Sequence, residues 1–170
     1  MTDDDRLPDP VTAARALPKG SLVIIRARDA ERRRALAEAL ATGTDGLILL
    51  AADDPVLAEG LHGLHLPEAR AREAAHWRAL RPDWVITVAA HSARALHAPY
   101  ADAVLLSPVF ATRSHPKAHP LTPVRARFIA RAALVPVLAL GGVTARNATL
   151  LFGFSGIAAI DGLGALPGKV

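Results

Sequence analysis

The sequence predicts an α/β fold in which helices cover a parallel sheet. Short apolar stretches alternate with helical segments along the chain, and most of these stretches are apolar on both faces, as strands buried between helices are. No glycine-rich dinucleotide fingerprint follows the first stretch, which counts against a Rossmann-type sheet. Because (β/α)₈ barrels usually exceed roughly 200 residues, a chain of 170 residues predicts an incomplete TIM (β/α)₈ barrel or an open doubly wound sheet.

Each expected strand is a short apolar run bounded by turn-forming residues. The first is rich in β-branched residues and follows Gly20, and the sixth ends abruptly in Gly141 and Gly142. The seven expected strands span residues 21–28, 46–51, 62–66, 84–90, 101–107, 135–141 and 156–161.

The helices between these strands are predicted mainly from their start signals. Asp29 can cap a helix over residues 30–41, and Pro55 stands near the start of one or two helical turns. Further helical segments are expected at residues 11–17, 70–80, 93–97 and 122–133, and after Thr144. A long loop at residues 108–123 is rich in Pro, His, Ser and Thr, and loops of this length are often functional.

Composition favours one domain over residues 1–170, with residues 1–20 as a truncated first β/α unit and 21–164 as the core. The chain is 51% hydrophobic and 21% charged, and none of its apolar runs approaches the ~18 residues that span a bilayer. The acidic N-terminus does not look like a secretory signal. The absence of cysteine excludes disulfides, thiolate metal sites and a cysteine nucleophile. We therefore expect a cytoplasmic protein that does not bind membranes.

The basic charge balance of +4 raises the question of nucleic-acid binding. The arginines, however, are spread over expected helix surfaces, and aromatic residues make up only 4% of the chain, so little is available to stack on bases. We expect no nucleic-acid partner, and small anionic substrates suit this charge balance.

Several residues at the ends of the expected strands can carry chemistry. Gly141 and Gly142 would let backbone N–H groups approach a phosphate closely, in the region where barrels commonly bind one. Arg26 and Arg28 lie two residues apart and so share a face of their strand. Two guanidinium groups on such a face point to phosphate binding or to a structural ion pair.

Acidic and histidine side chains offer further candidates, each with a structural alternative. Asp53 or Asp54 can hold Mg²⁺ or cap the helix that begins near Pro55. His62, His65 and His91 flank strands and can carry protons near neutral pH, or can be structural. The seven histidines lack the spacing of a zinc site.

The loop after the fifth strand is a candidate lid over a phosphorylated ligand. It combines hydroxyl groups with basic side chains, namely Ser107, Thr112, Arg113, Ser114, His115 and Lys117. A disordered connection is the alternative.

Six motifs in order resemble the thiamine phosphate synthase family, which includes the thiazole tautomerases. The two specific motifs are SPVFATRSH at residues 107–115 and VPVLALGGVTARN at residues 135–147. The weaker ones are IIRAR, LAADDPVLA, GLHL and VAAHS, at residues 24–28, 50–58, 63–66 and 88–92.

The resemblance implies a (β/α)₈ barrel that joins a hydroxymethylpyrimidine diphosphate to a thiazole phosphate and releases pyrophosphate. Arg26 and Arg28 would then face the pyrophosphate, and Asp53 would bind Mg²⁺. Thr112, Ser114 and His115 would belong to the substrate loop. Backbone N–H groups near Gly142, Ile160 and Asp161 would hold the thiazole phosphate. The tautomerase branch uses a histidine for proton transfer, and His91 matches that position.

The chain departs from the family pattern at several of these places. Ile24 replaces a Gln, Ala52 an Asn, and Arg70 a second metal-binding Asp. Arg28 and His115 replace lysines, and Asp161 replaces a Ser of the phosphate site. A tautomerase and a non-catalytic binder of a phosphorylated thiazole or thiamine-like ligand therefore stay open beside the synthase. The partners expected are small phosphorylated substrates and, as in many family members, further copies of the chain.

The two ends of the barrel also depart from the family. Residues 1–6 resemble the end of the family's first strand, whose body is missing, and no full helix follows the last strand. We expect a gap between the strands at 21–28 and 156–161, or a crude closure by residues 1–6. A misplaced start codon would account for it, in which case the codons just upstream encode an apolar strand.

Overall fold

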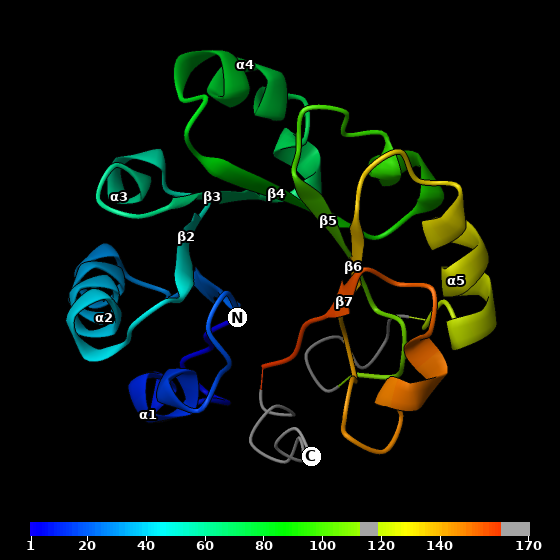
Figure 1. Ribbon diagram of the computed structural model, residues 1–170, viewed down its shortest axis with the longest axis horizontal. Coiled ribbons are helices and arrows are strands. Elements are labelled where there is room, and N and C mark those ends of the chain that lie inside the picture. The colour runs from blue at the N-terminus through cyan, green and yellow to red at the C-terminus, as the bar shows by residue number, and fades with distance from the viewer. Residues whose placement is uncertain (113–118, 161–170) are drawn as a thin grey trace.

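The computed structural model describes residues 1–112 and 119–160, and it confirms the incomplete barrel (Figure 1). Seven parallel strands are paired in chain order and curl into a half-barrel with the helices outside. They are Leu22–Ile25 (β1), Ile48–Ala52 (β2), Gly63–Leu66 (β3), Val85–Ala90 (β4), Ala103–Leu106 (β5), Val137–Ala139 (β6) and Gly156–Ile157 (β7). All seven lie where the apolar runs predicted them, although β7 is much shorter than expected.

Two helices begin at the predicted signals, whereas the helix expected at residues 70–80 begins at Glu73 and the segments expected at 93–97 and after Thr144 form only 3₁₀ turns. Asp29 caps α2 by accepting a hydrogen bond from the Arg32 N–H at 2.8 Å, and Asp54 caps α3 in the same way through the Leu57 N–H. The α-helices are Pro10–Arg15 (α1), Ala30–Gly43 (α2), Pro55–Ala58 (α3), Glu73–Leu80 (α4) and Pro123–Arg131 (α5). Three further segments are 3₁₀ turns, Glu68–Arg70 (η1), Ala93–Leu96 (η2) and Ala148–Leu151 (η3). Among the helices described, none is long and apolar enough to cross a membrane.

Side-chain alternation along the strands divides the core into an outer and an inner layer. Val23 and Ile25 of β1 pack outward against Leu40 of α2. Ile24 lies on the opposite face and clusters inside the curl with Leu50 and Leu105. Residues that continue the inner rows past the strand ends therefore point into the interior at the carboxyl rim.

The opening between β1 and β7 is bridged by the first residues of the described chain. The Met1 nitrogen donates to the Ala159 carbonyl at 3.2 Å, and the Thr2 N–H donates to the Ile24 carbonyl at 2.9 Å. The Thr2 hydroxyl also donates to the Arg26 carbonyl at 2.7 Å. The crude closure predicted for residues 1–6 is thus confirmed, and it fixes the backbone on both sides of Arg26.

Candidate functional site

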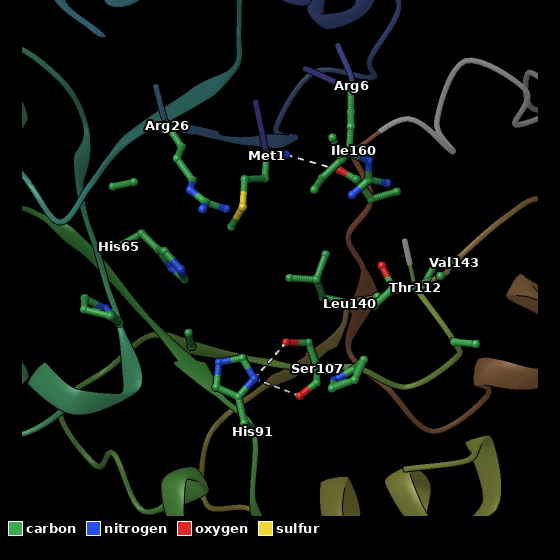
Figure 2. A pocket seen from close by; sticks show the side chains of 18 of the residues that line it. Met1, Arg6, Arg26, His65, His91, Ser107, Thr112, Leu140, Val143 and Ile160 are labelled. Atoms are coloured by element: carbon green, nitrogen blue, oxygen red, sulfur yellow. Dashed lines mark hydrogen bonds between the residues drawn. The ribbon is translucent and has the colours of Figure 1, made fainter. Parts of the chain in front are cut away.

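A cavity of about 1010 Å³ lies at the carboxyl ends of the strands (Figure 2). The inner rows of the sheet lead into it, since its walls include the residue that directly follows each of β1 to β6, and Ala159 and Ile160 shortly after β7. The predicted site residues that line it are Arg26, Asp53, His91, Thr112, Gly141, Gly142 and Ile160. Three others, Ser114, His115 and Asp161, lie outside the described residues.

Arg26 is the cation that the fold presents most openly to this cavity. It follows Leu22 and Ile24 on the inner row of β1, and its side chain extends into the cavity near His65 (Figure 2). Within the described part of the chain, its guanidinium group has no ion pair or hydrogen bond to a protein acceptor. An unneutralised guanidinium in a concave site favours binding of a phosphate or another anion.

Arg28, which was expected to share this role, lies elsewhere. Its side chain is 77% exposed and forms an ion pair with Asp5, while its N–H donates to Asp4 at 2.9 Å. The two-residue alternation holds within a strand, and β1 ends at Ile25. Beyond that point, contacts with the acidic N-terminal segment direct Arg28 away from the cavity. The structural ion pair that the sequence left open applies to Arg28.

The glycine turn after β6 forms a surface of backbone amides on the cavity wall. Gly141 and Gly142 both have positive φ, 93° and 64°. Among the contacts of the described residues, the N–H groups of Gly141, Gly142 and Val143 donate to no protein acceptor. Successive unpaired N–H groups with this backbone geometry are a common anion-binding feature.

Asn147 holds the glycine turn in place. Its amide nitrogen donates to the Gly142 carbonyl at 2.9 Å, and its amide oxygen accepts from the Thr144 N–H at 2.8 Å. The side chain therefore fixes both sides of Val143. The sequence did not single out Asn147, although it closes the motif at residues 135–147.

His91 and Ser107 form a polar pair on the cavity wall, at the ends of β4 and β5 (Figure 2). The His91 Nδ1 lies 3.0 Å from the Ser107 carbonyl and 3.3 Å from its hydroxyl. A carbonyl oxygen can only accept, so Nδ1 carries the proton in this contact and Nε2 remains a proton acceptor. The geometry thus gives His91 the tautomer that a general base needs.

His65 is buried at the inner side of the cavity, and its Nδ1 lies 2.8 Å from the Thr87 hydroxyl. Burial lowers the pKa of His65 from 6.5 to about 4, helped by the positive charges of the Met1 amino group and of Arg26. The imidazole is therefore neutral at physiological pH. The neutral imidazole can form hydrogen bonds with an uncharged ring of a ligand, but at this pH it is a poor proton acceptor.

Stability is expected to fall between about pH 6.5 and pH 4 because of His65. In this window the unfolded chain binds a proton at this position that the native protein does not, so the free energy of unfolding decreases as the pH falls. The loss approaches about 3 kcal/mol, since each pH unit per proton corresponds to about 1.4 kcal/mol. Urea unfolding at pH 7.5 and pH 4.5 measures it.

The His65→Gln variant is the control for this prediction, because it keeps a polar side chain near Thr87 and does not titrate. Its free energy of unfolding should change less between the two pH values than that of the wild type. An equal change in both proteins would assign the pH dependence to other groups.

Asp53, the predicted Mg²⁺ ligand, lines the cavity but is already paired with a cation. Its Oδ1 lies 2.5 Å from Arg70 Nη1, and Arg70 stands where the family resemblance places a second metal-binding Asp. No group of three His, Cys, Asp or Glu side chains within residues 1–112 and 119–160 is arranged to hold a metal. The described donor set around Asp53 therefore does not fit a divalent cation.

Two arginines of the cavity wall were missed in the sequence. Arg6 extends into the cavity beside Ile160 (Figure 2). Arg33, part of the Arg32–Arg34 run, reaches it from α2 and donates to the Ala27 carbonyl at 2.9 Å. No pattern in the sequence distinguishes Arg33 from its two neighbours on the helix surface.

Comparison with known proteins bears on which chemistry this cavity serves. The family model described as thiamine monophosphate synthase matches residues 2–163. The chain belongs to this family. The match includes the glycine turn and all the cavity-lining residues named above.

A curated family relative is the "Putative thiamine-phosphate synthase 2" of Aquifex aeolicus. It is 34% identical over 113 residues, which are 64% of this chain and 60% of that protein. The chain thus aligns with less than two thirds of the relative's length.

Solved structures support the barrel architecture of this family member. Thiamine phosphate pyrophosphorylase from Pyrococcus furiosus superposes with a TM-score of 0.75 at 21% identity, covering 96% of this chain and 85% of that one. A FabK mutant from Thermotoga maritima gives a TM-score of 0.65 at 19% identity, with 90% and 56% of the chains covered. At these identities the likeness concerns the fold alone.

Proposed function

We propose that the protein joins a hydroxymethylpyrimidine diphosphate to a thiazole phosphate and releases pyrophosphate. The observation that supports this most directly is that Arg26, Thr112 and Gly142 line one cavity in a member of the thiamine monophosphate synthase family. The cavity joins an open guanidinium group to a wall of unpaired amides. Two phosphorylated substrates need two such anion sites.

In the proposed reaction, the bond between the pyrimidine methylene carbon and the diphosphate oxygen breaks, and its electron pair leaves with pyrophosphate. The lone pair of the thiazole nitrogen forms the new carbon–nitrogen bond. The Arg26 guanidinium stabilises the charge that develops on the leaving group. The amides of Gly142 and Val143 hold the thiazole phosphate, so that the ring nitrogen is oriented for attack.

A thiazole tautomerase is the second candidate, and His91 is the observation that favours it. Its Nδ1 is committed to the Ser107 carbonyl at 3.0 Å, which leaves Nε2 as the acceptor. A base of this kind can remove a proton from one position of a thiazole phosphate and return it at another. That reaction requires no diphosphate.

The test is a turnover assay on the purified protein with both substrates. We expect thiamine phosphate and pyrophosphate in equal amounts. If the assay instead gives an isomerised thiazole and no pyrophosphate, and His91→Ala abolishes this isomerisation, the protein is a tautomerase and not a synthase. A rise in melting temperature with thiazole phosphate, but no product of either kind, would indicate a non-catalytic binder.

A further inference from the structure

Arg70 fills the position at which Asp53 would otherwise meet a metal ion. It belongs to η1, which follows β3, and so approaches Asp53 from the neighbouring strand. Its Nη1 lies 2.5 Å from Asp53 Oδ1, and its Nε and Nη2 lie 2.7 and 2.5 Å from the two carboxylate oxygens of Glu73. The guanidinium group thus bridges the two carboxylates on adjacent edges.

Glu73 is held in its ionised form by this arrangement. The hydrogen bond from Arg70 lowers the pKa of Glu73, and the bonds to Glu73 and Asp53 raise the pKa of Arg70. A divalent cation bound to Asp53 Oδ1 would lie next to the guanidinium group and be repelled by it. Glu73, already bound on both oxygens, has little capacity left to coordinate metal.

The backbone around Asp53 keeps its side chain close to Arg70. Asp53 has a φ of 54°, and its N–H donates to the His65 carbonyl at 2.9 Å. The residue is therefore tied to β3, from whose end Arg70 also comes. Rotation of the Asp53 side chain toward a metal would break the ion pair without offering a second carboxylate.

The charges that line the cavity fit an anion that arrives without a metal ion. Among the described lining residues, the guanidinium groups of Arg6, Arg26 and Arg33 outnumber the carboxylates, of which Asp53 is the single example. Asp53 is paired with Arg70, and Arg33 lies 3.4 Å from Asp54, so the positive field at the strand ends comes chiefly from Arg26, which has no ion pair among the described residues. Free pyrophosphate carries several negative charges that such a field attracts.

We propose that Arg70 replaces the divalent cation at Asp53, so that this cavity binds a diphosphate group through guanidinium groups without Mg²⁺. The diphosphate part of this inference rests on the proposed function. The statement about the metal site does not, because it follows from the Asp53–Arg70–Glu73 contacts alone.

Manganese titration followed by electron paramagnetic resonance tests the metal site without any turnover. The wild-type protein should bind no Mn²⁺ tightly, whereas Arg70→Asp, which restores a carboxylate, should bind it about tenfold more tightly or better. Arg72→Asp is the matched control, because it makes the same charge change on an exposed side chain two residues away. It should behave like the wild type.

Inorganic pyrophosphate provides the second measurement, and Asp53→Asn the second variant. Pyrophosphate should raise the melting temperature equally in excess EDTA and in Mg²⁺, in the wild type and in Asp53→Asn. Tight Mn²⁺ binding by the wild type that Asp53→Asn abolishes would overturn the proposal, as would stabilisation by pyrophosphate that requires Mg²⁺. Because neither measurement follows product, failure of the synthase reaction is read separately in the turnover assay.

Discussion

Replacing Arg26 with alanine is expected to lower kcat/KM for pyrophosphate release by about 10²–10³, the usual effect of removing one group that stabilises developing charge in a closed site. Arg26 has no protein anion to neutralise it within the described residues, and its side chain points into the cavity (Figure 2). Its charge is therefore available to the leaving group. The free energy of unfolding should change little, because no ion pair is lost.

Two further variants make this prediction specific. Arg26→Lys keeps the positive charge but not the planar fork, so it should recover part of the lost activity. Arg28→Ala should stay within about twofold of the wild type, because an exposed ion pair with Asp5 contributes little. Equal losses in Arg26→Ala and Arg28→Ala would contradict the placement of these two residues.

The strands could be predicted from the sequence because a buried parallel strand leaves a strong local signal. Residues 46–51 and 101–107 are apolar on both faces. The structure places β5 within the second range and β2 over the first, ending one residue later, and most of their side chains are buried. The family motifs at residues 107–115 and 135–147 added the order of the strands around the barrel. The weakest element, β7, is two residues long and leaves almost no periodicity to detect.

Individual site residues were harder to predict, because their roles depend on contacts between distant segments. The spacing of Arg26 and Arg28 gave the correct cavity position for Arg26, but Asp5 lies 23 residues from Arg28 in sequence and redirects it. Asp53 was correctly placed at the cavity. Its pairing with Arg70, 17 residues away, depends on the register of β2 and β3.

The glycine turn was predicted from the sequence as a place where backbone approaches a ligand, and the structure adds a second reason for glycine. A Cβ atom built on Gly142 would lie 2.3 Å from the Ala111 carbonyl oxygen and 2.9 Å from the Phe110 Cβ. The turn thus packs directly against the start of the long loop after β5. Sequence reasoning had no means of seeing this contact across about 30 residues.

Gly142→Ala is accordingly expected to disturb stability and binding together. The residue has a φ of 64°, which costs a side chain about 1–2 kcal/mol, and the clash with Ala111 adds to this. Because the turn or the loop must move, the N–H groups of Gly142 and Val143 leave their positions. We expect a lower urea midpoint and loss of the rise in melting temperature caused by thiazole phosphate.

Gly153→Ala separates the two causes of this effect. Gly153 also has a positive φ, 89°, but a Cβ atom there meets nothing within 4 Å. This variant should therefore show the backbone penalty of about 1–2 kcal/mol alone and keep its response to thiazole phosphate. If Gly142→Ala loses no more stability than Gly153→Ala and still responds to the ligand, the close approach to Ala111 does not hold the amides of the turn in their binding positions.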